Sequence, residues 1–119
     1  MKQPTPDHPI TVQPSPRRVR VLFNGKVVAD TSRALALAEA SYPAVMYIPR
    51  ADANMSVFKP TDHQTHCPYK GDASYFTLEV DGKSARNAVW SYVEPFPAVA
   101  AIKEYLAFYP DRVDAIELV

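Results

Sequence analysis

The chain has 119 residues, of which 47% are hydrophobic and 22% are charged, which is enough apolar material for one domain with a buried core. Its thirteen basic and thirteen acidic residues cancel, so no overall positive field attracts a phosphate backbone and a nucleic-acid partner is disfavoured. The single cysteine excludes an intramolecular disulfide, and neither a signal peptide nor an apolar membrane-spanning run is visible. We therefore expect a cytoplasmic protein with no membrane partner.

Proline is frequent in this chain and glycine is rare, with twelve prolines and three glycines. Because prolines interrupt helices and end strands, we expect short elements joined by ordered loops. Five of the prolines lie in residues 1–16, which predicts a Pro-rich N-terminal arm ahead of a single globular β-rich domain over residues 17–119. The arm is either free or lies along the body through Ile10 and Val12, whose alternation suits an edge strand.

Alternating apolar residues and turn signals predict a mainly β fold, α+β at the margin, with one or two short helices. Residues 18–29 should form a hairpin, because Asn24-Gly25 tolerates the positive φ angles of a type I′ turn, and Asp81-Gly82 is a second such signal. Residues 33–40 fit a helix by propensity and a strand by alternation, and the periodicity does not decide. Further strands are expected over residues 45–48, 74–80, 88–93, 105–109 and 113–118, and a short helix over 98–103.

The stretch from Thr65 to Tyr75 concentrates reactive residue types around the only cysteine, Cys67. The two nearby histidines are poorly placed as a base for the Cys67 thiol. In an extended strand His63 lies about 13 Å from Cys67, and the adjacent His66 points to the opposite face. These residues also lack the second Cys or His pair that a four-ligand zinc site needs, so no metal is expected.

Lys70 is a better electrostatic neighbour for the thiol of Cys67. Pro68 fixes φ and Gly71 permits a left-handed residue, so the turn can bring the Lys70 ammonium near the sulfur and favour the thiolate. The alternative is a buried and unreactive cysteine, since cysteine is among the most buried residue types.

Polar and aromatic side chains recur at the ends of the predicted strands. Trp90 and Tyr92 share one face of their strand and either belong to the core or wall a pocket in which a planar ligand stacks. Arg50 and Asp52 either hold an anion or form a local ion pair in a loop. Glu39 is either a surface carboxylate or a group of the site.

Several segments occur in an order that is shared with a known family. They are Gly25 to Thr31, Tyr47 to Arg50 with Asp52, Thr65 to Tyr75, Ala88 to Tyr92 and Leu106 to Pro110. Together they resemble the domain of unknown function (DUF) 427 family, which is mostly bacterial, and the resemblance covers nearly the whole chain. Its most specific part is the Cys-Pro-aromatic-Lys-Gly centre.

The resemblance implies a β-tent-like fold, in which two antiparallel sheets converge at one edge. Zinc-binding proteins of that class use paired Cys-x-x-Cys knuckles, which this chain lacks, so the resemblance implies a fold without zinc. The family is also labelled a nucleotidyltransferase domain. The Gly-Ser motif with paired carboxylates that is usual in such enzymes is not visible in this sequence.

Two function hypotheses follow, and the sequence does not decide whether the protein is an enzyme. The first is a small-molecule pocket around the Cys-Pro-Tyr-Lys-Gly turn for an anionic or nucleotide-like ligand, with no cofactor. Its candidate catalytic residues are Cys67 as nucleophile, Lys70 as anion-binding group and Glu39 as acid or base. Its candidate ligand-binding residues are Tyr47, Arg50, Gly71, Tyr75, Trp90 and Tyr92. The second hypothesis is a non-catalytic interaction or scaffold module, such as a homodimer, in which Cys67 is structural.

Overall fold

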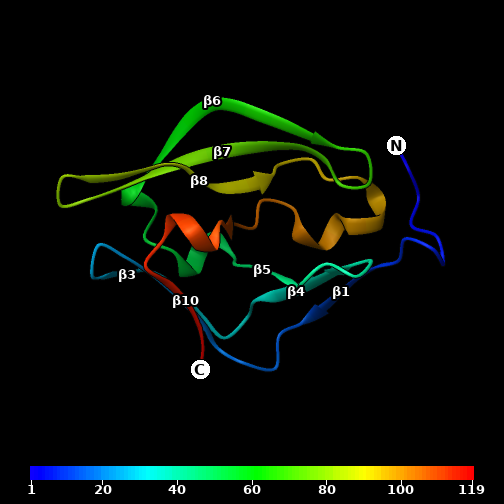
Figure 1. The fold of residues 1–119 in the computed structure, drawn as a ribbon, viewed down its shortest axis with the longest axis horizontal. Coiled ribbons are helices and arrows are strands. Elements are labelled where there is room, and N and C mark those ends of the chain that lie inside the picture. Colours follow the sequence, from blue (N-terminus) through cyan, green and yellow to red (C-terminus); the bar gives the residue numbers. More distant parts are fainter.

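Ten β-strands and four short 3-10 helices make up the structure, a computed structural model that describes residues 1–119. The prediction of a mainly β fold is confirmed. The strands lie in two layers that face each other across a buried core (Figure 1). No helix of the structure is long and apolar enough to cross a membrane.

The first layer is a four-stranded antiparallel sheet with the order β6-β7-β8-β9. Three of its strands form a meander of long hairpins, which runs along the upper side of the view in Figure 1. The strands are β6 (Phe58–Cys67), β7 (Gly71–Val80), β8 (Lys83–Tyr92) and β9 (Ala107–Phe108).

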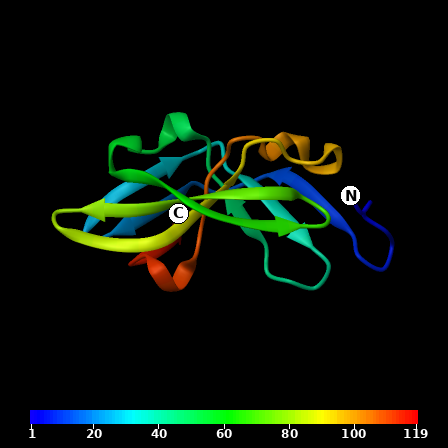
Figure 2. The ribbon, with the colours of Figure 1, turned by 90° about the horizontal axis from the view of Figure 1, so that it is seen from above.

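The second layer is divided into two three-stranded antiparallel sheets, so the structure has three sheets in place of the two expected. Figure 2 shows these strands beneath the long hairpins of the first layer. One sheet has the order β1-β4-β5, with β1 (Ile10–Pro14), β4 (Leu35–Glu39) and β5 (Val45–Tyr47). The other has the order β10-β2-β3, with β10 (Ala115–Leu118), β2 (Val19–Phe23) and β3 (Lys26–Thr31).

Both hairpin turns are confirmed. Asn24-Gly25 joins β2 to β3 and Asp81-Gly82 joins β7 to β8, and all four residues have positive φ, as a type I′ turn requires. The undecided segment 33–40 contains a strand, β4, because it pairs with β1 on one side and β5 on the other. The arm does not hang free, since β1 is the edge strand that Ile10 and Val12 suggested.

The helical segments are short because they occupy the loops between strands. They are η1 (Arg50–Asp52), η2 (Met55–Val57), η3 (Pro97–Ile102) and η4 (Pro110–Arg112). Proline begins both η3 and η4, where its fixed φ suits a first helical turn. The expected helix over 98–103 is therefore present as η3, and its Val99 and Ile102 side chains are buried.

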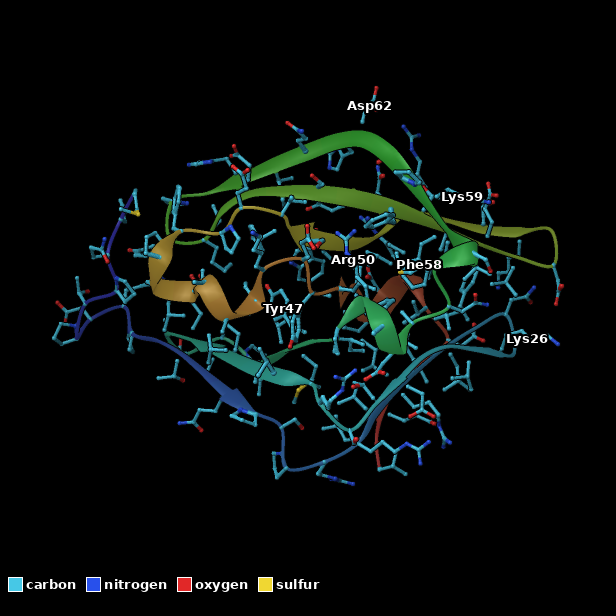
Figure 3. The ribbon with its side chains drawn as sticks, turned by 180° about the vertical axis from the view of Figure 1, so that it is seen from behind. Lys26, Tyr47, Arg50, Phe58, Lys59 and Asp62 are labelled. Atoms are coloured by element: carbon cyan, nitrogen blue, oxygen red, sulfur yellow. The ribbon has the colours of Figure 1, made fainter.

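The buried residues form two clusters between the layers. The larger contains fifteen residues and holds β2 and β3 against β7, β8 and β9. The smaller contains eight residues, among them Leu37, Tyr47, Tyr92 and Ile102, and lies under the first sheet near the β6–β7 turn. Figure 3 shows Tyr47 and Phe58 pointing between the layers, whereas Lys59 and Asp62 point outward. The candidate site lies on the smaller cluster.

Candidate functional site

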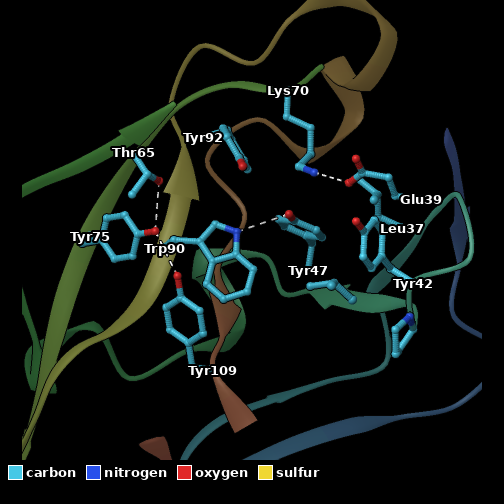
Figure 4. Close-up of a pocket in the computed structure, with 12 residues that line it drawn as sticks. Leu37, Glu39, Tyr42, Tyr47, Thr65, Lys70, Tyr75, Trp90, Tyr92 and Tyr109 are labelled. Carbon is cyan, nitrogen blue, oxygen red and sulfur yellow. Dashed lines mark hydrogen bonds and ion pairs between the residues drawn. The ribbon is translucent and has the colours of Figure 1, made fainter. Parts of the chain in front are cut away.

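A cavity of about 420 Å³ opens beside the smaller cluster, between β4 and β5 on one side and β6, β7 and β8 on the other (Figure 4). Six of its lining side chains are aromatic and two are charged, and we call it the aromatic pocket. It is lined by Leu37, Glu39, Tyr42, Pro43, Val45, Tyr47, Thr65, Lys70, Tyr75, Trp90, Tyr92 and Tyr109.

The β6–β7 turn places Lys70 at this pocket. Cys67 and Gly71 are paired across the hairpin, and the Lys70 amide donates to the Cys67 carbonyl at 3.3 Å, which closes a three-residue loop. Gly71 has a φ of +111°, and a Cβ there would lie 3.4 Å from the Glu94 carbonyl oxygen. The tight turn expected from the proline and the glycine is therefore present, and it needs glycine at position 71.

Lys70 and Glu39 form an ion pair at one end of the pocket. The Lys70 ammonium donates to Glu39 Oε1, and the two side chains are only 12% and 16% exposed. His8 Nε2 lies 2.8 Å from the other carboxylate oxygen of Glu39, and the His8 ring stacks on Tyr69 at 4.1 Å between centroids. The N-terminal arm therefore touches the same carboxylate as the turn.

The charge of Glu39 is stabilised by these partners. Burial alone would raise the pKa of Glu39, but hydrogen bonds from Lys70 and His8, together with their positive charges, lower it below the ordinary value. Glu39 is therefore ionised at neutral pH. Only one hydrogen bond of the Lys70 ammonium is used within the protein, so two of its three donors are free for a ligand.

Aromatic side chains joined by hydrogen bonds form the rest of the pocket wall. Trp90 Nε1 donates to the Tyr47 hydroxyl at 3.3 Å, and the Tyr75 hydroxyl lies 3.0 Å from Thr65 Oγ1 and 3.1 Å from the Tyr109 hydroxyl. The Trp90 and Tyr109 rings lie 4.6 Å apart between centroids. These contacts hold the rings in fixed orientations around the opening (Figure 4).

Burial keeps the hydroxyls of Tyr47, Tyr92 and Tyr109 protonated. It raises the pKa of Tyr47 and of Tyr92, and burial together with the neighbouring Tyr75 raises the pKa of Tyr109 to about 12. The Tyr92 hydroxyl makes no hydrogen bond within the protein. Every fully buried side-chain nitrogen or oxygen of the structure has a hydrogen-bond partner, so the Tyr92 oxygen is not fully buried and is open to the pocket. With Lys70, it gives the pocket a set of free hydrogen-bond donors at neutral pH.

The structure brings six of the nine sequence-predicted site residues together around one cavity. They are Glu39, Tyr47, Lys70, Tyr75, Trp90 and Tyr92. The three others, Arg50, Cys67 and Gly71, do not line it. Gly71 acts through the backbone of the turn, as described above.

Arg50 and Asp52 do not pair with each other, so the local ion pair, one of the two alternatives that the sequence left open, is absent. The Arg50 guanidinium donates to the Glu104 carbonyl at 2.7 Å and to Ser91 Oγ at 3.1 Å, and it lies over the Phe76 ring. Asp52 instead accepts bonds from Arg33 and Thr31. Both residues lie in a loop after a strand, as the sequence predicts. Their hydrogen-bond partners lie on segments distant in the chain, so the spacing of residues in the sequence could not identify them.

Cys67 packs against the smaller cluster and is partly buried. Its thiol makes no hydrogen bond, and the side-chain partner of the Lys70 ammonium is Glu39. His66 pairs instead with Asp72 on the surface, and His63 contacts the Tyr75 ring. The Lys70 ammonium therefore bonds to Glu39 and makes no hydrogen bond with the thiol.

Sequence reasoning missed three polar side chains of the pocket wall, Tyr42, Thr65 and Tyr109, and the arm residue His8. The Tyr109 and Thr65 hydroxyls both lie within hydrogen-bond distance of the Tyr75 hydroxyl. The only local sign of their role in the sequence is that each is a hydroxyl-bearing residue near the end of a strand. His8 precedes Glu39 by 31 residues, and nothing in the sequence links them. No group of three or more His, Cys, Asp or Glu side chains lies close enough to hold a metal ion.

A family model described as "Domain of unknown function (DUF427)" matches residues 11–118, which include every strand except the first residue of β1. No curated protein sequence matches the chain significantly.

Proposed function

The chain belongs to the DUF427 family, whose description assigns no function, and we propose from the cavity that the protein binds a small molecule in the aromatic pocket. The observation that carries this proposal is the Lys70–Glu39 ion pair, which is largely closed to water and lies beside six aromatic rings. Pockets for small molecules typically combine apolar and aromatic walls with a few convergent polar groups.

The aromatic walls favour a ligand with a flat apolar part. The rings of Trp90, Tyr109 and Tyr75 are oriented by packing and hydrogen bonds, so a planar ligand can lie against them without their reorganisation. In Figure 4 the ion pair lies at the top of the view, Tyr109 at the bottom and Trp90 between them. A ligand that fills the pocket therefore meets both charge and aromatic surface.

The free donors favour a ligand that bears an acceptor group. Two donors of Lys70 and the Tyr92 hydroxyl are unused, whereas the Glu39 carboxylate already accepts from Lys70 and His8. A carboxylate, a phosphate or a ring carbonyl would accept hydrogen bonds from this end of the pocket. An aromatic carboxylate and a nucleotide are the two simplest ligands of this kind.

We propose binding and not thiol catalysis as the activity of this site. Cys67 does not line the pocket, and the ammonium that would activate its thiol is bonded to Glu39. An activated cysteine normally needs a nearby cation and access to the reactant.

The test is a thermal-shift measurement with benzoate and uridine monophosphate, followed by isothermal titration calorimetry of whichever binds. A ligand present at a hundred times its dissociation constant should stabilise the protein by about 2.7 kcal/mol. Lys70→Met should weaken binding roughly tenfold to a hundredfold, because a charged hydrogen bond is lost. Tyr92→Phe should weaken it by a smaller factor, about twofold to tenfold.

Lys26→Met is the matched control, because Lys26 is an exposed lysine of β3 that does not line the pocket. It should leave the dissociation constant unchanged. The proposal is overturned if neither compound binds, or if Lys70→Met and Lys26→Met lose binding affinity to the same extent.

A further inference from the structure

A second cavity borders the aromatic pocket and has a different chemical character. It has a volume of about 550 Å³ and contains no charged side chain, and we call it the apolar groove. It is lined by Val21, Tyr42, Pro43, Ala44, Val45, Met46, Ile48, Trp90, Phe108, Pro110, Ile116 and Leu118.

The two cavities share part of their walls. Tyr42, Pro43, Val45 and Trp90 line both of them, so the apolar groove lies directly beside the aromatic pocket. Neither Glu39 nor Lys70 lines the groove. A molecule that passes these four side chains therefore moves from the charged and donor-rich pocket onto a mainly apolar surface without charged side chains.

The groove lies where two of the sheets are not joined. β5 contributes Val45 and Met46 from one sheet, and β10 contributes Ile116 and Leu118 from the other. No backbone hydrogen-bond ladder connects β5 to β10, so side chains form the surface between these two strands. Leu118 is 42% exposed although it is a large apolar residue.

We infer that the ligand of the aromatic pocket is an elongated amphipathic molecule, whose apolar tail lies in the apolar groove. This inference rests on the proposed function, because the head of the molecule is the planar, acceptor-bearing group assigned to the pocket. We assign the molecule an apolar tail for two reasons. The pocket and the groove share the wall of Tyr42, Pro43, Val45 and Trp90, and no charged side chain lines the groove. An unsubstituted nucleotide is thereby disfavoured, because it has no apolar tail to cover this surface.

The test is a series of ligands with one head group and a growing tail. Benzoate, para-butylbenzoate and para-octylbenzoate are titrated calorimetrically into the full-length protein, each below its micelle-forming concentration. Each added methylene should tighten binding about twofold to fourfold until the groove is filled. Leu118→Lys should remove most of this gain and leave the affinity for benzoate unchanged.

Val27→Lys is the matched control, because Val27 is similarly exposed at 47% and lies on β3 outside both cavities. It should preserve the dependence on tail length. If benzoate binds and the longer compounds bind no more tightly, the inference fails and the proposed function stands. If tail dependence is lost equally in both variants, the tail does not lie in the groove.

Other occupants of the groove give different results in the same experiments. If no member of the series binds, this inference fails, and the proposed function fails with it only if uridine monophosphate does not bind either. If sedimentation shows that the wild-type protein is a dimer and Leu118→Lys is a monomer, a second copy covers the groove and the inference is overturned. A monomer in both cases, together with tail-dependent binding, supports it.

Discussion

At the scale of the residue, the Glu39 carboxylate joins three parts of the chain that are distant in sequence. It lies at the end of β4 and accepts hydrogen bonds from Lys70 in the β6–β7 turn and from His8 in the arm. The sequence could suggest Glu39 and Lys70 separately, because of their types and positions. It could not pair them, because the contact depends on how two sheets face each other.

We expect Glu39→Gln to lower the free energy of unfolding by about 1–3 kcal/mol at neutral pH. The reason is that the Lys70 ammonium loses its charged acceptor in a place that is largely closed to water. The pKa of Glu39 in the folded protein lies below its ordinary value, so the stabilisation is present above the unfolded pKa and is lost as the pH falls through the folded pKa. Urea unfolding of both proteins across this pH range measures it.

The difference in stability between wild type and Glu39→Gln should therefore shrink below about pH 4. Glu79→Gln is the control, because Glu79 is an exposed carboxylate of β7 without an ion pair. That variant should stay within about 0.5 kcal/mol of wild type at every pH. A Glu39→Gln effect of the same size in acid and at neutral pH would contradict the assignment.

At the scale of the element, the hairpins were predictable because their signals are local. Asn24-Gly25 and Asp81-Gly82 carry the φ requirement of their turns in two adjacent residues. The segment 33–40 was not predictable, because alternation and helix propensity both fitted and only pairing with β1 and β5 decided. The division of the second layer into two sheets likewise has no local signal.

The turn that presents Lys70 should be more sensitive to substitution than the turn after β7. Gly71 has a φ of +111° and a Cβ there would contact the Glu94 carbonyl, whereas at Gly82 a Cβ would meet nothing within 4 Å. Gly82→Ala should cost about 1 kcal/mol of stability from backbone strain, and Gly71→Ala about 2 kcal/mol or more. Chemical unfolding compares the two, and equal losses would contradict the greater constraint at position 71.

At the scale of the whole molecule, one short contact ties the two layers together by backbone hydrogen bonds. Ile48, which follows β5, exchanges two bonds of 2.8 Å with Leu106, which precedes β9. Both side chains are fully buried in the larger cluster. The mainly β class could be predicted from the pattern of apolar residues in the sequence. The contact between Ile48 and Leu106 could not, because these residues are far apart in the chain.

Leu106→Ala should therefore lower the free energy of unfolding by about 2–5 kcal/mol, because it leaves a cavity at the junction of the layers. That is a large share of the roughly 5–15 kcal/mol that holds an ordinary domain together. Urea unfolding followed by far-UV circular dichroism measures the change. Val27→Ala, at an exposed position, should change stability by less than about 0.5 kcal/mol, and a similar effect of the two substitutions would refute the role of Leu106.

Trp90 is the only tryptophan of the chain, and its indole stands in the wall shared by the aromatic pocket and the apolar groove. The unlabelled protein therefore carries one tryptophan fluorophore, located where the ligand is proposed to bind, which can be excited selectively over the seven tyrosines. Its emission responds to the polarity around the indole and to the hydrogen bond that the ring N–H donates to Tyr47. Spectral changes on adding a compound to the folded protein thus point to this wall.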